Sequence, residues 1–394
     1  MNNTIGIYIH IPFCVKKCPY CDFNSVSDAN IPDNAYIDTV LKELAAHIEG
    51  EPSLAYKTLE TIYIGGGTPS LIKPHNIKRL VSGIKRMFLG LHSQEITIEV
   101  NPGTVKKDAL TGLLDAGINR LNIGIQSFND KTLKTLGRIH SAKDTLKCYE
   151  YARRTGFDNI GIDLIFGIPD QSVDEWEQDL KTAIALKPEH ISAYNLTVEK
   201  GTEFFELQKS RGLIQPSEEE QVLMYELAID SLKEAGYNHY EISNFSLNDF
   251  ESRHNLRYWS CMDYIGLGAG AHSYISSPDK NIQGEPSCWG IRWWNESDTV
   301  SYMRQVNGTE QAIAGKEILT KKEALEEGIF LGLRRLKGID TNWFLRRFNL
   351  PLKDLYASKI TALKTAGLLY EDAHSIRLTR KGLFLSNEVF SELI

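Results

Sequence analysis

The strongest constraint on the fold is an alternation of apolar, strand-like runs with helical segments over residues 5–198. Six runs rich in isoleucine and other strand-forming residues are separated by stretches with helical spacing. The runs are IGIYIHI (5–11), LETIYIGG (59–66), EITIEVNP (95–102), NRLNIGIQSF (119–128), NIGIDLIFGIP (159–169) and HISAYNLTV (190–198). This alternation is typical of parallel β/α units. Six units predict an α/β fold built as a partial (β/α)6 TIM-like barrel, with an open doubly wound sheet as the alternative.

Each of the later five runs has polar residues or glycines at or just after its C-terminal end. Parallel strands bring their carboxyl ends to one face, and β/α barrels carry out their chemistry there. We therefore expect one site on that face, although any single residue could instead be a helix cap or a turn residue. The residues concerned are Gly66, Gly67, Thr68, Glu99, Asn101, Gln126, Ser127, Asp163, Tyr194, Asn195 and Thr197.

The rest of the chain divides by pattern. We expect the barrel to occupy residues 1–235 and to close with an amphipathic helix at 217–235. Residues 236–314 are rich in aromatic side chains without regular spacing, and we expect an irregular connecting region there. Residues 315–394 read as helix, turn, helix and a hairpin, which predicts a small, mostly helical, winged-helix-like domain.

The apolar runs are far shorter than the roughly 18–20 residues of a membrane span. The start of the chain has no basic residues before its apolar part, so no secretory signal is expected. We expect a cytoplasmic protein, with peripheral contact at a membrane as an alternative. The net charge of −7 argues against nucleic acid as the main partner.

Charge is distributed unevenly. Residues 334–382 carry eleven Lys and Arg residues against four Asp and Glu residues. A winged-helix module with this charge could bind DNA. However, the basic residues are spread along helices instead of gathering on one recognition face, so a face for an acidic protein, a membrane surface or a carboxylate ligand is favoured.

Half of the six cysteines lie within eight positions, in FCVKKCPYC, as Cys14, Cys18 and Cys21. Thiolates suit zinc or iron–sulfur clusters. A structural zinc site needs four ligands, but no second C-x2-C pair exists and His10 falls within the strand pattern. Three cysteines on a four-iron cluster would leave one iron open for a substrate or cofactor. The remaining cysteines are expected to be small, buried apolar groups, and they are Cys148, Cys261 and Cys288.

The C-x3-C-x2-C spacing after a first strand resembles the signature of the radical S-adenosylmethionine (SAM) superfamily. Further blocks are similar to the oxygen-independent coproporphyrinogen III oxidase family, and more closely to its heme chaperone branch, HemW. These blocks are IYIHIPFCVKKCPYC, YIGGGTPS, IEVNP, GIQSF, GRIHSAKD and IDLIFGIPDQ. The resemblance implies a 4Fe-4S cluster on the three cysteines and SAM on the open iron. It also implies heme as cargo and apo-hemoprotein clients, including membrane-associated respiratory enzymes, with no nucleic acid partner.

The resemblance also assigns a SAM site. Tyr8 would lie beside SAM, and Tyr20 would shield the cysteine loop. The glycines would let the backbone approach the methionine amine, and the charged groups would pair with the amine, the carboxylate or the ribose hydroxyls. The SAM-binding residues that the resemblance implies are Tyr8, Tyr20, Gly66, Gly67, Thr68, Glu99, Gln126, Arg138 and Asp163.

Three features favour the chaperone branch over the oxidase. Phe23 stands where the oxidase has a fourth cysteine, and the chain reaches Cys14 without the oxidase's long N-terminal extension. The block from His254 to Trp259 matches the H-N-x-x-Y-W pattern of the chaperone branch. The leading hypothesis is therefore a heme chaperone. The alternatives are SAM-dependent decarboxylation of coproporphyrinogen III and a zinc-binding winged-helix regulator, and whether SAM is cleaved stays open.

The H-N-x-x-Y-W block could contact heme directly. His254 could bind the iron, and the rings of Tyr258 and Trp259 offer flat apolar surface. Arg253 and Arg257 could pair with the propionates. The alternative is a hydrogen-bonded histidine in an aromatic core, and His272 is a rival ligand.

Overall fold

A computed structural model describes residues 3–27, 31–210, 212–276 and 288–394. Six strands, which correspond to the six predicted runs, form the centre of one sheet and are all parallel. They are β1 (Thr4–Ile11), β4 (Thr58–Gly66), β5 (Gly90–Val100), β6 (Arg120–Gln126), β7 (Ile160–Phe166) and β8 (His190–Asn195). They lie side by side in chain order, whereas a doubly wound sheet would reverse its order at a switch point. The partial barrel is therefore confirmed.

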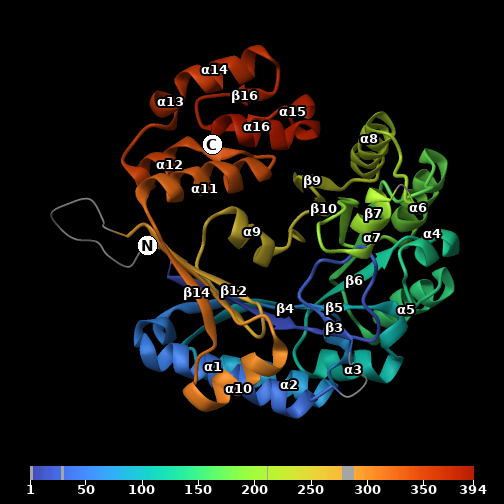
Figure 1. The fold of residues 1–394 in the computed structure, drawn as a ribbon, viewed down its shortest axis with the longest axis vertical. Coiled ribbons are helices and arrows are strands. Elements are labelled where there is room, and N and C mark those ends of the chain that lie inside the picture. The colour runs from blue at the N-terminus through green and yellow to red at the C-terminus, as the bar shows by residue number, and fades with distance from the viewer. Residues whose placement is uncertain (1–2, 28–30, 211, 277–287) are drawn as a thin grey trace.

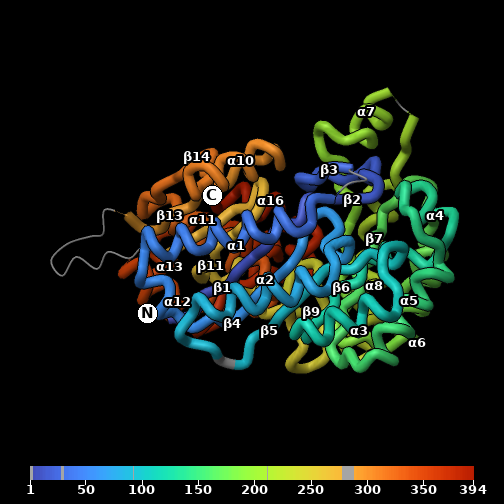
Figure 2. The backbone as a smooth tube through the Cα atoms, turned by 90° about the horizontal axis from the view of Figure 1, so that it is seen from below, coloured from blue at the N-terminus to red at the C-terminus, as the bar shows by residue number. Residues whose placement is uncertain are grey.

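Helices cover the outer face of these strands (Figure 2). They are α1 (Asp33–Gly50), α2 (Pro74–Arg86), α3 (Lys107–Asp115), α4 (Asp130–Thr135), α5 (Ala142–Thr155), α6 (Val173–Leu186) and α8 (Glu218–Glu234). Three of them begin at serine caps that form capping boxes, at Ser141, Ser172 and Ser217. Such caps satisfy backbone N–H groups that the first helical turn leaves unpaired.

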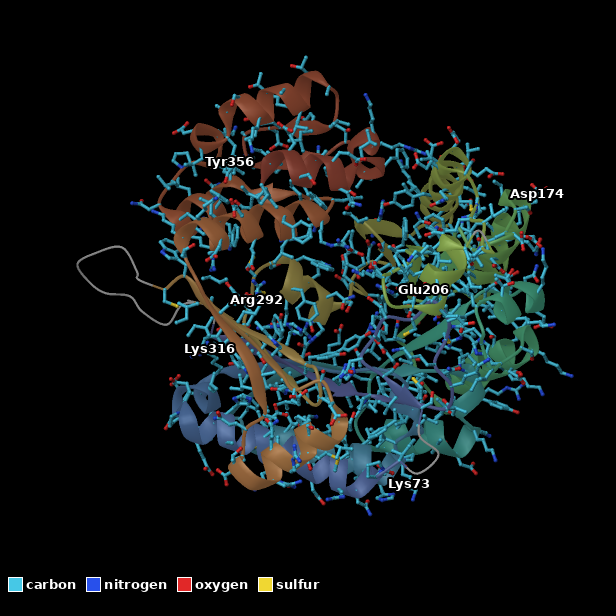
Figure 3. The ribbon with its side chains drawn as sticks, viewed as in Figure 1. Lys73, Asp174, Glu206, Arg292, Lys316 and Tyr356 are labelled. Carbon is cyan, nitrogen blue, oxygen red and sulfur yellow. The ribbon has the colours of Figure 1, made fainter. Side chains whose placement is uncertain are left out.

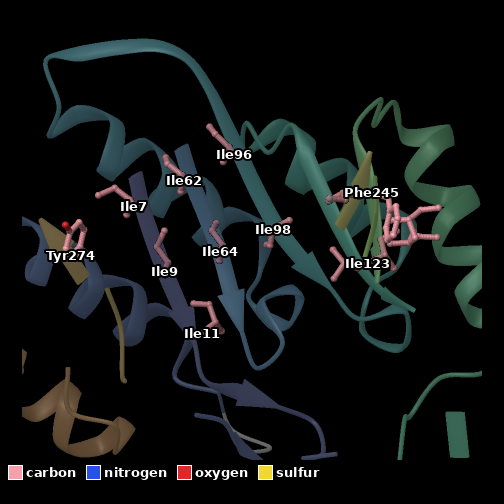
Figure 4. Close-up of a cluster of buried hydrophobic side chains, with 14 of the residues drawn as sticks. Ile7, Ile9, Ile11, Ile62, Ile64, Ile96, Ile98, Ile123, Phe245 and Tyr274 are labelled. Atoms are coloured by element: carbon pink, nitrogen blue, oxygen red, sulfur yellow. The ribbon is translucent and has the colours of Figure 1, made fainter. Parts of the chain in front are cut away.

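The core lies between the sheet and these helices. Isoleucines such as Ile7, Ile9 and Ile62 point outward from neighbouring strands and are fully buried (Figure 4). Because side chains alternate along a strand, the residues between them, such as Tyr8, point to the opposite, concave face. The alternation thus separates a dry outer core from an inner face that carries polar groups.

The expectation of an irregular segment at 236–314 is wrong for the part that the structure describes; residues 277–287 of it lie outside the described residues. The segment extends both edges of the sheet. Its elements are β9 (Asn238–Glu241), β10 (Asn244–Ser246), α9 (Arg253–Trp259), β11 (Tyr264–Leu267), β12 (His272–Ser276), β13 (Gly290–Asn295), α10 (Thr299–Thr309) and the start of β14 (Ile313–Leu319). The strands are three to seven residues long, and mixed aromatic and polar residues blur their alternation, so the pattern did not predict them.

These added strands are arranged differently at the two edges. β10 and β9 pair antiparallel beyond β8, whereas β11 pairs parallel with β1. Beyond β11, the strands β12, β13 and β14 continue antiparallel. The register places Tyr264 beside Gly6 and opposite Tyr274, so the concave face of the barrel continues onto the antiparallel strands.

The C-terminal region is mostly helical, as expected, and includes a three-stranded antiparallel sheet. Its elements are α11 (Lys321–Arg334), β15 (Ile339–Asp340), α12 (Thr341–Phe348), α13 (Leu352–Leu355), α14 (Ala357–Thr365), β16 (Leu369–Glu371), β17 (Ser375–Leu378), α15 (Arg380–Phe384) and α16 (Ser386–Leu393). It lies on the other side of the sheet from α1 and α2, with α9 between (Figure 1). A double hydrogen bond from Arg380 to Asp230 ties it to α8. Every helix in the described ranges is too short or too polar to span a bilayer.

Candidate functional site

The three cysteines lie on a loop that leaves the end of β1. Short strands β2 (Phe13–Cys14) and β3 (Val26–Ser27) pair and close this loop at its base. Among the residues that the structure describes, no three His, Cys, Asp or Glu side chains gather around one metal-ion position.

Polar groups point toward two of the sulfurs. The Thr68 hydroxyl donates to the Cys14 sulfur at 3.4 Å, and Nη1 of Arg138 lies 3.8 Å from the Cys18 sulfur. A hydroxyl donor and a guanidinium cation thus lie beside two of the three sulfurs. Burial raises the pKa of the Cys21 thiol, and a bound metal would favour its thiolate form.

Gly67 brings the backbone against the cysteine loop. A Cβ atom at this position would lie 2.9 Å from the Cys14 sulfur and 2.9 Å from the backbone oxygen of Phe13. Gly66, the residue before it, has a φ of 115°, which side chains rarely permit. Both glycines of the motif are therefore required by space or by backbone conformation.

His10 holds the loop and does not act as a fourth ligand. Its Nδ1 lies 3.0 Å from the Tyr8 hydroxyl, and its Nε2 lies 2.7 Å from the backbone oxygen of Asn24. Asn24 in turn donates to the backbone oxygens of Ala269 and Ser297, at 3.0 and 2.9 Å. The cysteine loop is thus fixed to the added strands on its own side of the barrel.

Two carboxyl groups occupy the concave face beside the loop. Glu99 accepts hydrogen bonds from the Tyr63 hydroxyl at 2.8 Å and from the backbone N–H of Gly66 at 3.1 Å. Burial raises the pKa of Glu99 to about 7. Asp163 accepts from the amide of Asn122 at 2.6 Å, and burial raises its pKa. Both acids can therefore meet a cationic or hydroxyl-bearing ligand at this face.

Gln126 and Arg138 complete the polar set. Gln126 has a φ of 70° at the end of β6, a left-handed conformation that is uncommon for a residue with a side chain. The chain just after it is held by Asp179, which accepts from the Ser127 hydroxyl at 2.6 Å and from Phe128 N–H at 2.7 Å. Arg138 donates through Nη2 to the backbone oxygen of Gly124 at 3.0 Å.

The buried polar atoms that lack a partner among the described residues include two at this face, Oδ1 of Asp163 and Nε of Arg138. Buried groups of this kind are normally paired, so an unpaired carboxylate oxygen and an unpaired guanidinium nitrogen fit a polar ligand in the space between. The site is thus chemically suited to SAM, whose amine, carboxylate and ribose hydroxyls are complementary groups.

Aromatic rings border the site. Tyr8 stacks on Tyr63 with ring centroids 6.2 Å apart, and Tyr20 leans against Phe204 of α7 (Glu203–Lys209), also at 6.2 Å. Burial raises the pKa of both Tyr8 and Tyr20, so both stay neutral.

Helix α9 carries the H-N-x-x-Y-W block and packs against the inner side of β4. His254 is 1% exposed, its pKa is lowered to about 3 by burial, and both ring nitrogens are hydrogen-bonded. Its ring stacks on Tyr63 at 5.3 Å, directly behind the Glu99 contact. No nitrogen is left for iron, so the geometry favours the histidine of an aromatic core.

The remaining groups of this block point in different directions. The expectation that Arg257 pairs with propionates does not fit, because Arg257 is 1% exposed and forms an ion pair with Glu60 inside the barrel. Arg253 also pairs with Glu60, at 3.0 Å. Trp259 instead lies under Arg334, outside the barrel, while the rival ligand His272 is exposed and stacks on Trp294 at 5.8 Å.

The sequence did not single out Tyr63, Asn122, Asn24 or Asp179 for this site. A signal existed for two of them. Tyr63 is two positions before Gly65 on β4, and Asn122 is four positions before the candidate Gln126 on β6. Residues at even spacing on a strand lie on the same face, so Tyr63 and Asn122 lie on the concave face. Asn24 and Asp179 act through contacts between distant parts of the chain, and no local pattern marks them.

Comparisons with known proteins agree with this geometry. Residues 8–183 match the Radical SAM superfamily, and residues 319–385 match the HemN C-terminal domain. Heme chaperone HemW of Lactococcus lactis is 38% identical over 98% of this chain and 96% of its own length. Heme chaperone HemW of Bacillus subtilis is 36% identical over 98% of each. The structure of coproporphyrinogen III oxidase (HemN) from Escherichia coli has the same fold, with a TM-score of 0.81 at 24% identity over 99% of this chain and 90% of that one.

Proposed function

This chain belongs to the heme chaperone HemW family within the radical SAM superfamily, and from that membership we propose that it binds heme and transfers it to apo-hemoproteins. The observation that carries the proposal is sequence identity of 38% along 98% of the chain, which includes both the cysteine loop and the C-terminal region. A likeness limited to the barrel would support only the superfamily, because one fold hosts many functions.

Superfamily membership implies a 4Fe-4S cluster and SAM. Cys14, Cys18 and Cys21 would hold the cluster, and the chemistry supplied by the bound pair is one-electron cleavage of a sulfonium. Thr68 and Arg138 donate toward the sulfurs of Cys14 and Cys18. The chain's own contribution is to fix the loop and to keep one side of the cluster facing the concave site.

The concave residues would orient SAM. The backbone at Gly66 and Gly67 has no Cβ and can approach the methionine amine. Glu99 and Asp163 offer carboxylate oxygens, and Arg138 offers a guanidinium nitrogen that is unpaired among the described residues. Tyr8 and the packed face of α9 close the inner side of the site, which excludes water from it.

Fewer observations support the alternative function as a coproporphyrinogen III oxidase. The likeness to HemN from Escherichia coli at 24% identity supports the fold alone. Phe23, at the position of the oxidase's fourth cysteine in the resembled family, is 60% exposed and cannot ligate iron. We keep decarboxylation of coproporphyrinogen III as the outcome that would overturn the chaperone proposal.

We extend the proposal to the clients. Apo-hemoproteins, including membrane-associated respiratory enzymes, are the acceptors, and the chain would meet the latter by peripheral contact at the membrane. The excess of basic residues over 334–382 supports contact with an acidic surface of this kind.

A transfer assay tests the function. The protein is reconstituted anaerobically with iron and sulfide, loaded with heme and mixed with apomyoglobin, and the Soret spectrum is followed as heme moves to the acceptor. Heme-loaded albumin serves as a passive donor control, and we expect faster transfer from this chain. Conversion of coproporphyrinogen III to protoporphyrinogen IX with SAM and a reductant, without heme transfer, would overturn the proposal.

A further inference from the structure

A groove of about 1830 Å3 lies between the C-terminal region and the edge of the barrel. We call it the C-terminal groove. Its walls come from the end of α1, the turn after α9, the strands β12 to β14 and the segment from α11 to β17. None of the cysteines or concave-face residues that would hold the cluster or SAM lines it. The groove is therefore a second site, separate from the one described above.

Flat aromatic rings line this groove. It takes in four of the six tryptophans of the chain, namely Trp259, Trp289, Trp293 and Trp343. The indole N–H groups of Trp259 and Trp293 have no partner among the described residues. Indole rings offer a large apolar surface together with one polar hydrogen, which suits a flat ligand that has polar groups at its edge.

The groove is also positively charged. Its lining has six basic side chains against three acidic ones, although the chain as a whole carries −7. The basic residues are Lys57, Lys316, Arg335, Lys337, Arg346 and Arg347, and the acidic ones are Glu51, Asp263 and Asp340. Lys316, labelled in Figure 3, lies on β14 below the C-terminal helices. This charge balance favours a ligand that carries carboxylates.

These basic residues differ in their contacts and exposure. Arg347 donates to the Tyr274 hydroxyl at 2.8 Å, and its buried Nε has no partner among the described residues. Arg346, its neighbour on α12, is exposed. Lys337, in the turn before β15, is also exposed. The groove thus offers both a hydrogen-bonded guanidinium and exposed cations to an anionic edge.

We propose that the C-terminal groove is the heme-binding site, with the porphyrin ring against its tryptophans and the propionates toward the cations around α12. This inference rests on the proposed function, which makes heme the cargo. It also accounts for the H-N-x-x-Y-W block, because the helix that buries His254 in the barrel places Trp259 in the groove. The groove volume exceeds the roughly 300–1,000 Å3 of usual small-ligand pockets, so there is volume enough for a ligand as large as heme.

Charge reversal tests the assignment without disturbing the core. Heme is titrated anaerobically into the reconstituted full chain and into the Arg346→Glu/Lys337→Glu double variant, and the Soret band is followed. We expect the dissociation constant for heme to rise by at least about tenfold, because a charge-assisted contact is worth roughly 1.5–3 kcal/mol. The matched control, Lys143→Glu/Lys147→Glu on the exposed side of α5, has the same charge change and should bind as the wild type. Circular dichroism and iron content show that both variants fold.

The remaining experiments distinguish a failure of the groove assignment from a failure of the proposed function. Heme dimethyl ester lacks free carboxylates, so the groove variant and the wild type should bind it equally. If the wild type binds no heme, the proposed function fails. A second outcome is that the wild type and the groove variant bind heme equally well, while His272→Ala does not bind it. In that case the groove assignment fails and the proposed function stands. If the groove variant binds heme normally but no longer transfers it to apomyoglobin, the groove holds the client and the assignment is overturned.

Discussion

Nδ1 of His254 lies 2.7 Å from the hydroxyl oxygen of Thr61, across the interior of the barrel. The other ring nitrogen lies 2.8 Å from the Tyr258 hydroxyl. The ring stacks on Tyr63, whose hydroxyl donates to Glu99. The histidine that most resembles an iron ligand therefore packs behind the Tyr63–Glu99 contact on the concave face.

We predict that His254→Ala lowers stability but not heme affinity. The substitution leaves two buried hydroxyl groups unpaired and removes a packed ring, so the free energy of unfolding should fall by about 1–3 kcal/mol. Urea denaturation of the apo-protein measures this loss, and heme titration at a temperature where the variant is folded measures the affinity. A variant that keeps the wild-type stability but no longer binds heme would place the iron on His254.

Glu99 predicts a pH dependence of stability. Its folded pKa of about 7 is above the roughly 4.3 of an unfolded glutamate, so between these values the folded chain keeps a proton that the unfolded chain has lost. Stability should therefore fall as the pH rises from about 4 to 7. Glu99→Gln cannot ionise and should remove this loss, which is at most about 4 kcal/mol.

Urea denaturation at pH 5 and at pH 8 checks this expectation. The gain in stability of the variant relative to the wild type should be larger at pH 8 than at pH 5. SAM affinity should also tighten with pH in the wild type and stay flat in the variant, because the carboxylate is the form that pairs with a cation or a ribose hydroxyl. Equal pH profiles for the two proteins would show that Glu99 is not the titrating group.

Gly67→Ala should prevent the cluster from forming. The added methyl would lie 2.9 Å from the Cys14 sulfur and 2.9 Å from a backbone oxygen, closer than real Cβ contacts allow. We expect iron and sulfide content after anaerobic reconstitution to fall several-fold. The matched control is Gly308→Ala in α10, where a Cβ meets nothing within 4 Å. It should keep its cluster and gain up to about 1 kcal/mol of stability, since alanine favours helix.

Cys18→Ala should abolish the cluster, while Cys148→Ala should not. Cys148 is 3% exposed in the core between α5 and the sheet, with its pKa raised to about 12 by burial, so it cannot supply a thiolate. Iron analysis and electron paramagnetic resonance of the reduced proteins compare the two. Retention of a full cluster in Cys18→Ala would refute the assignment of the three cysteines.

Part of the site followed from local pattern. Strand alternation placed Glu99, Gln126 and Asp163 at one face, and the cysteine spacing marked the loop, because period and spacing are properties of a short stretch of chain. Arg138 contacts the Cys18 sulfur although the two residues are 120 positions apart. The resemblance to a family marked Arg138 only as a SAM-site residue and did not predict this contact. The boundaries at 235/236 and 314/315 stay predictions, and β14 runs across the second.

The sequence by itself determined the parallel barrel and the cysteine loop, because hydrophobic burial and metal ligation both depend on residue type at fixed short intervals. Only the tertiary structure determined where the side chains of the H-N-x-x-Y-W block lie. One turn of helix α9 points His254 into the barrel and Trp259 out of it, and a side chain's surroundings are set by what packs there from elsewhere in the chain. Thr61 and Arg334 lie 193 and 75 residues away from their respective partners, beyond the reach of any local pattern.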